Sequence, residues 1–499
     1  MMSQEVRVRF APSPTGPLHI GGVRTALYNY LLAKKLGGKM LLRIEDTDQN
    51  RFVPGAEQYI IESLQWLGIT IDEGVGVGGP HEPYRQSERS AIYQEHAQIL
   101  LDAGKAYYAF DTSEELDAMR ATFESQGSAF QYNAVTRTRL KNSLTLSDEE
   151  VKAKIEAGEP YVIRLKVPAK EEIRFKDLIR DWVHVHSSTI DDKVLMKSDG
   201  LPTYHLANVV DDHLMNITHV IRGEEWLPSA PLHVMLYRAF GWENTMPQFA
   251  HLPLLLKPEG NGKLSKRDAE IGGFPVFPLE WTNPEGVKSI GFREEGYLKE
   301  ALINFLAFLG WNPGTEQEIF SLDELTQAFS LERINKSGAK FDINKAKWYN
   351  EQYLRQQTDE ALAAQYLTEF ESDKAVKIVH LFKERVTFPQ QIVSEANALF
   401  VAPTSYDQAV IASKWNDDAK KAITAFKEAL PALDNYVADE IKHTLSAELE
   451  KLGIKMGKVM QALRVAVTGA GAGPDLMLLM EIIGKDAVIQ RLDTALTTL

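Results

Sequence analysis

Two segments of the chain combine residue types that suit phosphate binding. The first, APSPTGPLHIGG, spans residues 11–22 and holds three prolines, which restrict the loop so that little entropy is lost when it closes on a ligand. Its His19 can donate hydrogen bonds to phosphate oxygens as charge builds on them. Gly21 and Gly22 open a predicted helix, whose first N–H groups carry partial positive charge and attract anions. An ordinary strand-to-helix turn with a core histidine is the alternative.

The second segment, GKLSKRD, spans residues 262–268 and gathers cations. Lys263, Lys266 and Arg267 lie beside Ser265 in a glycine-rich loop. Mobile cations can follow negative charge to a departing pyrophosphate, so this composition suits triphosphate chemistry. Solvated surface charge is the alternative. The loop follows a predicted apolar strand, however, and ligands of open α/β sheets collect at the carboxyl ends of the strands, which favours a ligand-binding loop.

A strand, a helix and a second strand must position the first segment. Apolar and arginine side chains alternate over residues 6–10, which predicts a strand that places Arg9 opposite Val8 and Phe10. Apolar residues then recur at helical spacing until two lysines and two glycines end the pattern at residues 34–38. KMLLRIEDTD, at residues 39–48, predicts a buried strand with an acidic exit. Together these elements form a βαβ unit and therefore part of a parallel sheet.

The α/β pattern is interrupted and later replaced along the chain. Residues from about 105 to about 197 mix short strands and helices, which predicts an insertion. The α/β pattern resumes at PTYHLANVVDDH, with apolar strands at residues 218–223 and 249–256. Beyond about residue 297 nearly every segment has helical periodicity. This change of class between residues 300 and 350 is the main predicted domain boundary.

The composition is that of an ordinary soluble globular protein. The 499 residues allow two to four domains, and 44% of them are hydrophobic and 25% charged. No apolar run approaches the roughly 18 residues of a membrane helix, and MMSQEVRV lacks the pattern of a secretory signal, so we expect a cytoplasmic protein. The absence of cysteine excludes disulfides, thiolate zinc sites and a cysteine nucleophile. The net charge of −14 argues against a polyanionic partner, but it does not exclude a basic face that binds RNA.

Seven motifs in the same order resemble those of one enzyme family. PLHIGG and KLSKR are similar to the two signatures of class I aminoacyl-tRNA synthetases. RFAPSPTG, RIEDTD, YRQSER, PTYHLANVVDDH and VIRGEEWL narrow the resemblance to the glutamyl-tRNA synthetase family, bacterial type. The C-terminal GIKMGKVMQALRVAVTG resembles the anticodon-binding end of that family. The resemblance therefore covers the chain from about residue 6 to its end.

The resemblance implies an α/β fold in which a Rossmann-type parallel-sheet catalytic domain is split by an α+β acceptor-binding insertion and followed by an all-α anticodon-binding region. The expected ranges are 1–105 for the first half of the catalytic domain, 106–197 for the insertion, 198–270 for the second half with the KLSKR loop, 271–350 for a stem-contact region and 351–499 for the helical region.

The resemblance also implies residue roles. The residues expected to bind glutamate are Arg9, Ala11, Ser13, Glu45, Tyr204, Asn208 and Arg222. Those expected at the ATP site are His19, Gly21, Gly22, Glu225, Lys263, Ser265, Lys266 and Arg267. Arg385 is a candidate reader of the anticodon. Without the resemblance, Arg9, Arg222 and Arg385 could be surface salt-bridge arginines, Tyr204 a packing aromatic, and Glu45 with Asp46 and Asp48 a polar loop exit.

The sequence departs from the family pattern in three places. Gly22 stands where many class I enzymes have a second histidine, so we expect more reliance on backbone N–H groups. AYYAF occupies the start of the cysteine zinc site that some members carry, so we expect no structural zinc and no protein-bound metal. Residues 272–291 form a longer link than usual, whose Pro, Trp and Phe content predicts an ordered loop near the catalytic mouth.

The implied activity is the ligation of L-glutamate to tRNA(Glu), with Mg-ATP as co-substrate and glutamyl-adenylate as intermediate. We expect a monomer, because no self-complementary apolar stripe is evident. A glutaminyl-tRNA synthetase, a short paralogue that glutamylates a modified tRNA base and a non-catalytic RNA-binding relative are the alternatives. The helical tail argues against the first, the length of 499 residues against the second, and His19 with Lys266 against the third. Whether tRNA(Gln) is also charged stays open.

Overall fold

The computed structural model describes residues 5–499 and divides into two compact units. One comprises the chain up to Glu295 together with Leu302–Ile343, and the other comprises Gly296–Ala301 together with Asn344–Leu499. Residues 1–4 lie outside the described residues. The first expected domain and the segment that was searched for a secretory signal both begin there. Within residues 5–499, no helix is both long and apolar enough to cross a membrane.

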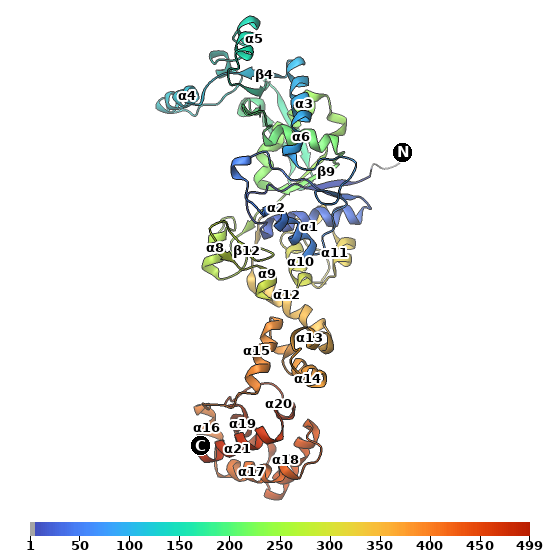
Figure 1. Cartoon of the computed structure of the whole chain (residues 1–499), viewed down its shortest axis with the longest axis vertical. Coiled ribbons are helices and arrows are strands. Elements are labelled where there is room, and N and C mark those ends of the chain that lie inside the picture. Colours follow the sequence, from blue (N-terminus) through green and yellow to red (C-terminus); the bar gives the residue numbers. More distant parts are fainter. Residues whose placement is uncertain (1–4) are drawn as a thin grey trace. The chain divides into compact units, whose positions relative to one another are not determined.

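A seven-stranded sheet, with β9 labelled in Figure 1, lies at the centre of the first unit. Its strand order is β3-β2-β1-β9-β10-β6-β7. Neighbouring strands run parallel from β3 to β6, and β7 is antiparallel to β6. The strands are β1 (Arg7–Phe10), β2 (Lys39–Leu42), β3 (Glu73–Gly74), β6 (Glu172–Asp177), β7 (Asp181–His186), β9 (His219–Gly223) and β10 (Gln248–Leu252). The strand order reverses between β1 and β9, so a ligand crevice is expected beyond their carboxyl ends.

The predicted strand over residues 6–10 is confirmed as β1, but it is buried on both faces. It lies between β2 and β9 near the middle of the sheet, where neither face meets water. Its two arginines are therefore paired with buried acids. Arg7 donates to both carboxylate oxygens of Glu73 at 2.8 and 2.9 Å, and Arg9 pairs with Asp212. The alternative of a surface arginine at position 9 is wrong, since this residue is only 3% exposed.

A small antiparallel sheet, β4-β5-β8, forms the insertion. Its strands are β4 (Ala106–Ala109), β5 (Val162–Leu165) and β8 (Val194–Met196), and its helices α4 (Ser113–Ser125) and α5 (Asp148–Glu156) both begin with capping boxes. Strands β6 and β7 fall within 106–197, the range expected for the insertion, but β6 pairs with β10 and β7 pairs with β6, so both belong to the large sheet. Ile173 and Phe175 of β6 are buried and alternate with exposed charged residues, as in a strand that packs on one face.

Helices and short strands complete the chain up to residue 343. The helices are α1 (Ile20–Lys35), α2 (Ala56–Trp66), α3 (Ser90–Asp102), α6 (Tyr204–Leu214), α7 (Ala230–Phe240), α8 (Lys266–Gly272), α9 (Phe292–Glu295), α10 (Lys299–Ala307) and α11 (Leu322–Ala328). The short strands β11 (Leu255–Leu256) and β14 (Ala339–Lys340) pair in parallel. Strands β12 (Trp281–Thr282) and β13 (Lys288–Ser289) form a hairpin inside the long 272–291 link.

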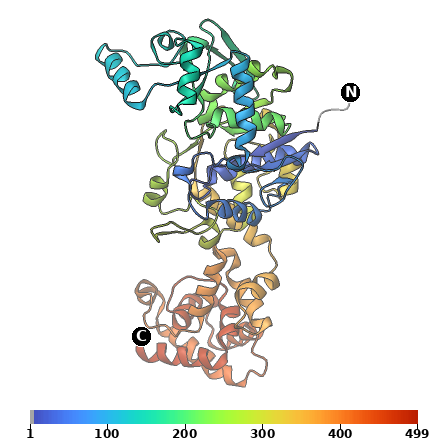
Figure 2. The same cartoon turned by 45° about the horizontal axis from the view of Figure 1, so that its top comes forward.

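The second unit is built from helices, as predicted (Figures 1 and 2). They are α12 (Ile343–Gln356), α13 (Asp359–Tyr366), α14 (Ser372–Phe382), α15 (Pro389–Leu399), α16 (Gln408–Lys414), α17 (Asp417–Ala429), α18 (Ala438–Leu452), α19 (Met456–Thr468), α20 (Leu476–Ile483) and α21 (Lys485–Thr498). Fully buried apolar side chains from several of them, such as Ile378, Phe426 and Leu463, form one core. No strand occurs among residues 344–499.

Candidate active site

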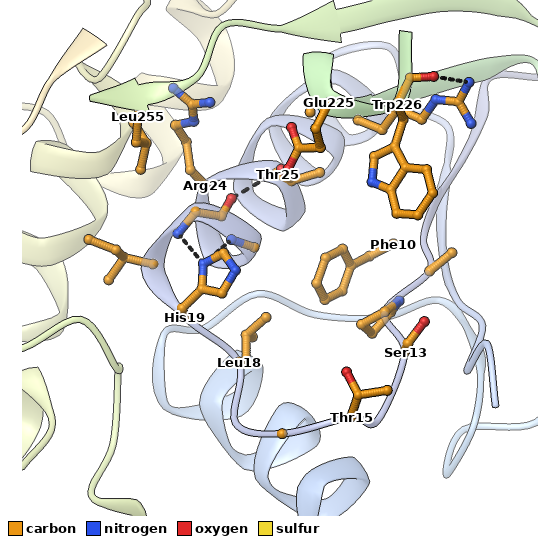
Figure 3. Close-up of a pocket in the computed structure, with 18 of the residues that line it drawn as sticks. Phe10, Ser13, Thr15, Leu18, His19, Arg24, Thr25, Glu225, Trp226 and Leu255 are labelled. Atoms are coloured by element: carbon orange, nitrogen blue, oxygen red, sulfur yellow. Dashed lines mark hydrogen bonds between the residues drawn. The ribbon is translucent and has the colours of Figure 1, made fainter. Parts of the chain in front are cut away.

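The start of α1 is capped by the side chain of His19 (Figure 3). Its Nδ1 accepts hydrogen bonds from the N–H groups of Gly21 and Gly22, at 3.1 and 3.4 Å. The N–H of Ile20 donates to the carbonyl of Val276 at 2.9 Å. The first N–H groups of the helix are therefore already engaged, whereas the sequence predicted that Gly21 and Gly22 would offer them to phosphate. What remains for a ligand is the other ring nitrogen, His19 Nε2.

The protonation state of His19 follows from this cap. Enclosure by the pocket walls lowers the pKa of His19, and nearby Lys263 lowers it further. The ring is therefore neutral at pH 7, and because Nδ1 accepts, the proton lies on Nε2. The two glycines make this geometry feasible. A Cβ at Gly22 would lie 2.5 Å from Leu18 Cδ1, and one at Gly21 would lie 2.9 Å from the His19 ring.

A pocket of about 630 Å³ opens where β1 and β9 end, which is the topological switch point of the sheet. Every predicted glutamate-binding residue lines it, and so does every predicted ATP-site residue except Arg267, which is exposed on α8. His19 and Lys266 thus share one cavity, although 247 positions separate them along the chain (266 − 19). Figure 3 shows His19, Glu225 and Trp226 around it, contributed by two distant segments.

One end of the pocket presents oxygen atoms that suit an ammonium group. Glu45 Oε1 accepts from Arg43 Nη2 at 3.1 Å and from Asn208 Nδ2 at 3.0 Å. Within residues 5–499, Glu45 Oε2 accepts no hydrogen bond, and the buried Asn208 Oδ1 has no partner. Burial raises the pKa of Glu45, and the nearby Arg43 and Arg9 only partly oppose this. A cationic ligand would satisfy both oxygens and favour the carboxylate.

The two pocket arginines differ in their counter-charges. Arg9 donates through Nε and Nη2 to Asp212, at 3.0 and 3.3 Å. Arg222 is only 5% exposed, yet its three recorded partners are the neutral Tyr204 hydroxyl at 2.6 Å, His251 Nε2 at 3.0 Å and the Trp226 carbonyl at 3.4 Å. Within the described part of the chain, no Asp or Glu forms an ion pair with Arg222. A buried cation in this state requires an anion from a ligand.

The other end of the pocket carries the cations of the second segment. Lys263 Nζ lies 3.1 Å from Glu225 Oε1, and Lys266 Nζ lies 5.1 Å from the centroid of the Phe277 ring. The hydroxyl of Ser265 caps α8 by accepting from the Asp268 N–H, so it serves the loop rather than an open ligand position. The long link reaches the same place, because Val276 lines the pocket.

The acids that follow Glu45 take structural positions. Asp46 accepts hydrogen bonds from the N–H and the hydroxyl of Ser87, at 2.8 and 2.6 Å, and Asp48 pairs with Arg51. Within residues 5–499, no three His, Asp or Glu side chains are grouped so that they could hold a metal ion. The expected absence of a structural zinc stays a prediction.

Comparisons with known proteins agree with this geometry. The family model of the class I tRNA synthetase catalytic domain (E and Q) matches residues 5–348, and an anticodon-binding domain matches residues 354–496. A glutamate–tRNA ligase of Cytophaga hutchinsonii is 64% identical over 100% of this chain and 98% of its own length. The chain belongs to the glutamate–tRNA ligase family of class I synthetases.

Further members of this family agree over the full chain. The glutamate–tRNA ligase of Christiangramia forsetii is 55% identical over 100% of both chains. The crystal structure of a glutamate tRNA ligase from Elizabethkingia meningosepticum in complex with its amino acid has a TM-score of 0.96 and 51% identity, and the match covers 99% of this chain and 100% of that chain. The predicted family, α/β catalytic fold and all-helical C-terminal region are confirmed.

The charged residues that support the pocket from behind were not predicted from the sequence. Arg43 is fully buried and forms ion pairs with Asp212 at 2.7 Å and with Glu45 at 3.1 Å. Arg89 forms an ion pair with Asp211 at 2.8 Å. The signal was available, because Asp211 and Asp212 directly follow the apolar Val209 and Val210 in PTYHLANVVDDH, the segment that forms most of α6. Charges at such positions are rarely buried unless they are paired.

In the second unit, Arg385 is exposed at the end of the short 3₁₀ helix Lys383–Arg385. Arg464 on α19, which interacts electrostatically with Arg385, was not predicted from the sequence. Burial and the charge of Arg385 lower the pKa of Arg464, whereas the charge of Asp475 raises it, and Arg464 Nη1 has no hydrogen-bond partner within residues 5–499. Arg385, Arg464 and Asp475 thus interact electrostatically on a unit that matches an anticodon-binding domain.

Proposed function

We propose that this chain ligates L-glutamate to tRNA(Glu) in two steps, with Mg-ATP as the co-substrate. The observation that carries the proposal is the buried Arg222, which faces the pocket without an acidic partner in residues 5–499. A side-chain carboxylate of the substrate supplies the missing charge. The full-length similarity to glutamate–tRNA ligases supports this assignment.

The amino acid is held at two points. Its α-ammonium group donates hydrogen bonds to the free oxygens of Glu45 and Asn208, and its side-chain carboxylate pairs with Arg222. Glutamine has nearly the same shape as glutamate but no negative charge. Its binding would leave the Arg222 guanidinium desolvated and unpaired, and a polar site built in this way can reject such an analogue by about 10⁴-fold or more.

In the first step, the α-carboxylate of glutamate attacks the α-phosphorus of Mg-ATP in line, and pyrophosphate leaves. His19 donates from Nε2 to a phosphate oxygen, while Lys263 and Lys266 follow the charge that develops on the leaving group. Lys263 exchanges its contact with Glu225 for the phosphate. No protein nucleophile is required, because the protein positions the reactants and stabilises charge.

In the second step, a ribose hydroxyl of the 3′-terminal adenosine of tRNA attacks the acyl carbon of glutamyl-adenylate. The new ester bond forms as the bond from the acyl carbon to the phosphate oxygen breaks, and AMP leaves. The enzyme acts as a monomer in the cytoplasm, carries no structural zinc and activates glutamate efficiently only with tRNA bound. Arg385 contributes to anticodon binding, and parallel charging of tRNA(Glu) and tRNA(Gln) tests which of them the enzyme accepts.

ATP–pyrophosphate exchange with glutamate, measured with and without tRNA(Glu), tests this function. We expect exchange when tRNA(Glu) is present and little exchange in its absence. No exchange under either condition would rule the function out. Tight tRNA binding without exchange would instead identify a non-catalytic RNA-binding relative. Exchange with glutamine in preference to glutamate would identify a glutaminyl enzyme.

A further inference from the structure

Three neighbouring strands each place one polar side chain at the same edge of the sheet. Arg222 near the end of β9 is in register with His251 on β10, and Asp177 at the end of β6 is in register with Phe249 of β10. The side chains form a continuous row. Arg222 Nε donates to His251 Nε2 at 3.0 Å, and His251 Nδ1 lies 2.6 Å from Asp177 Oδ2. His251 and Asp177 are fully buried.

Only the first member of this row reaches the pocket. Arg222 lines the cavity, whereas His251 and Asp177 lie behind it. Neither of the two is therefore able to touch a substrate. Their contacts nevertheless determine how the Arg222 guanidinium is held, because its Nε–H has His251 as its recorded acceptor.

The hydrogen-bond pattern fixes the tautomer of His251. Burial raises the pKa of Asp177, but the hydrogen bonds from His251 and from the N–H groups of Ile179 and Arg180 more than compensate, so the group is a carboxylate. A carboxylate accepts only, so His251 Nδ1 carries the proton that it donates. Burial lowers the pKa of His251, which keeps the ring neutral. Its Nε2 therefore holds a lone pair and can accept from Arg222.

We propose that Asp177 and His251 are positioning residues that orient Arg222 for recognition of the substrate's side-chain carboxylate. Asp177 holds His251 in the tautomer whose Nε2 accepts, and His251 fixes the Nε edge of the guanidinium. Of the five N–H groups of Arg222, three have recorded partners, so the remaining two are available to a carboxylate. This inference rests on the proposed function and adds to it the two residues, His251 and Asp177, that hold Arg222 in its selective orientation.

The physical benefit of the row is preorganisation. A guanidinium held only at its tip by Tyr204 and Trp226 could rotate to present fewer donors or to satisfy a neutral amide. An arginine fixed at three points meets a carboxylate without further loss of side-chain entropy. In metal sites, loss of partners of this kind typically costs about 10- to 100-fold in affinity, and we expect a similar effect here.

Three substitutions separate the two contacts of His251. His251→Gln places an amide where Nε2 lies and can still accept from Arg222, whereas His251→Asn places one near Nδ1 and keeps only the contact with Asp177. The amide of Asp177→Asn can donate to His251 Nδ1, and the ring proton would then move to Nε2. There it would face the Nε–H of Arg222, and two donors cannot form a hydrogen bond. Each variant is measured as the full chain, by tRNA(Glu) charging and by thermal unfolding.

We expect His251→Asn and Asp177→Asn to raise KM for glutamate by about 10- to 100-fold, and to lower the preference for glutamate over glutamine similarly. KM for ATP should change less than about twofold in both, and His251→Gln should stay within about fivefold of the wild type for glutamate. Equal KM values for glutamate in all three variants and the wild type would overturn the proposal. A loss of kcat alone, with KM unchanged, would show a merely structural role and would also overturn it. Absence of charging by the wild-type enzyme would instead count against the proposed function itself.

Discussion

The two arginines of the pocket have the same side chain but different charge environments. Arg9 is neutralised by Asp212, which also binds Arg43, so its field at the pocket is reduced. Arg222 is held by a phenol, an imidazole and a carbonyl, none of which is charged. Recognition of an anionic substrate should therefore depend more strongly on Arg222 than on Arg9.

Arg222→Lys tests this difference directly. Lysine keeps the positive charge, but it cannot bind a carboxylate with two parallel N–H groups while also contacting His251 and Tyr204. We expect kcat/KM for glutamate to fall at least about 10²-fold, with KM for ATP unchanged. Arg238→Lys is the matched control, because Arg238 on α7 pairs with Glu171 and does not line the pocket. An equal loss in both variants would contradict the assigned role of Arg222.

Glu45 gives a prediction about pH. Because burial raises its pKa above the ordinary 4.5, protonation begins at a higher pH than for an exposed glutamate. Protonation removes the negative charge that attracts the α-ammonium group, so KM for glutamate should rise as the pH falls into the acidic range, and should do so at a higher pH than an ordinary glutamate would cause. Glu45→Gln should have a KM that is roughly 10- to 100-fold higher at pH 7 and that no longer varies in this acidic range. A variant that keeps the acidic limb of the wild-type profile would assign that limb to another group.

Residue types could be predicted from the sequence more readily than their hydrogen bonds. His19 and Lys263 stood out because they follow predicted strands, whereas Arg222 was named only through the family resemblance. That His19 uses Nδ1 for its own helix depends on the turn geometry, which the sequence does not specify. The ion pair between Arg9 and Asp212 could not be predicted from one sequence either, because 203 positions separate these residues.

At the scale of elements, α1 shows how one residue can serve both folding and chemistry. His19 caps the helix through Nδ1 and leaves Nε2–H for a ligand. These two roles can be separated, because asparagine is a good N-cap residue but has no donor at the position of Nε2.

His19→Asn should therefore keep the stability of the wild type and lose about 10²–10³-fold in kcat for glutamate activation. His19→Ala should lose similar activity and, in addition, about 1 kcal/mol of unfolding free energy, because Gly21 and Gly22 lose their acceptor. Urea unfolding and pyrophosphate exchange on both variants measure the two effects. If asparagine destabilised the chain as much as alanine, the cap would not be the structural role of this histidine.

The central strand β1 gives a prediction about stability. The hydrogen bonds from Arg7 lower the pKa of Glu73 to about 2, so the carboxylate stabilises the folded state above its ordinary pKa and loses this effect as the pH falls towards about 2. Glu73→Gln leaves the buried Arg7 with only the exposed Glu5, 3.8 Å away, as a charge partner and should cost about 3–5 kcal/mol at pH 7. The difference in unfolding free energy between this variant and the wild type should be smaller at about pH 3.5, since only the wild type has a carboxyl group at position 73 that takes up a proton.

Glu156→Gln, at an exposed ion pair on α5, is the control and should change the unfolding free energy by less than about 0.5 kcal/mol. A difference for Glu73→Gln that did not shrink with falling pH would contradict this titration.

Periodicity predicted which segments form strands of the large sheet better than it predicted which strands pair with each other. The βαβ start and the strands at 218–223 and 249–256 follow from local pattern. The placement of β6 does not, because its alternating pattern fits any half-exposed strand, and only its pairing with β10 assigns it to the large sheet. This is also why Asp177 was not recognised as a neighbour of the pocket.

At the scale of the whole molecule, a net charge of −14 must be reconciled with a polyanionic substrate. Binding of tRNA requires only local positive charge, and the exposed Arg385 is a candidate for such a contact on the helical unit. The helical class of this unit could be predicted from periodicity, but the electrostatic interaction of Arg385 with Arg464 could not, because 79 positions separate the two residues along the chain (464 − 385).

Because phosphate contacts release counterions, the affinity for tRNA should fall steeply with salt even though the protein is acidic overall. Between about 50 and about 200 mM KCl we expect Kd for tRNA(Glu) to rise at least about tenfold, whereas KM for ATP should change less than about twofold. Arg385→Gln should weaken tRNA binding and reduce the slope of log Kd against log salt by about one if its guanidinium meets a phosphate. Lys414→Gln on α16 is a control for an ordinary exposed cation of the same unit. A salt-independent Kd would exclude binding through a basic face, and an unchanged slope in Arg385→Gln would remove Arg385 from that face.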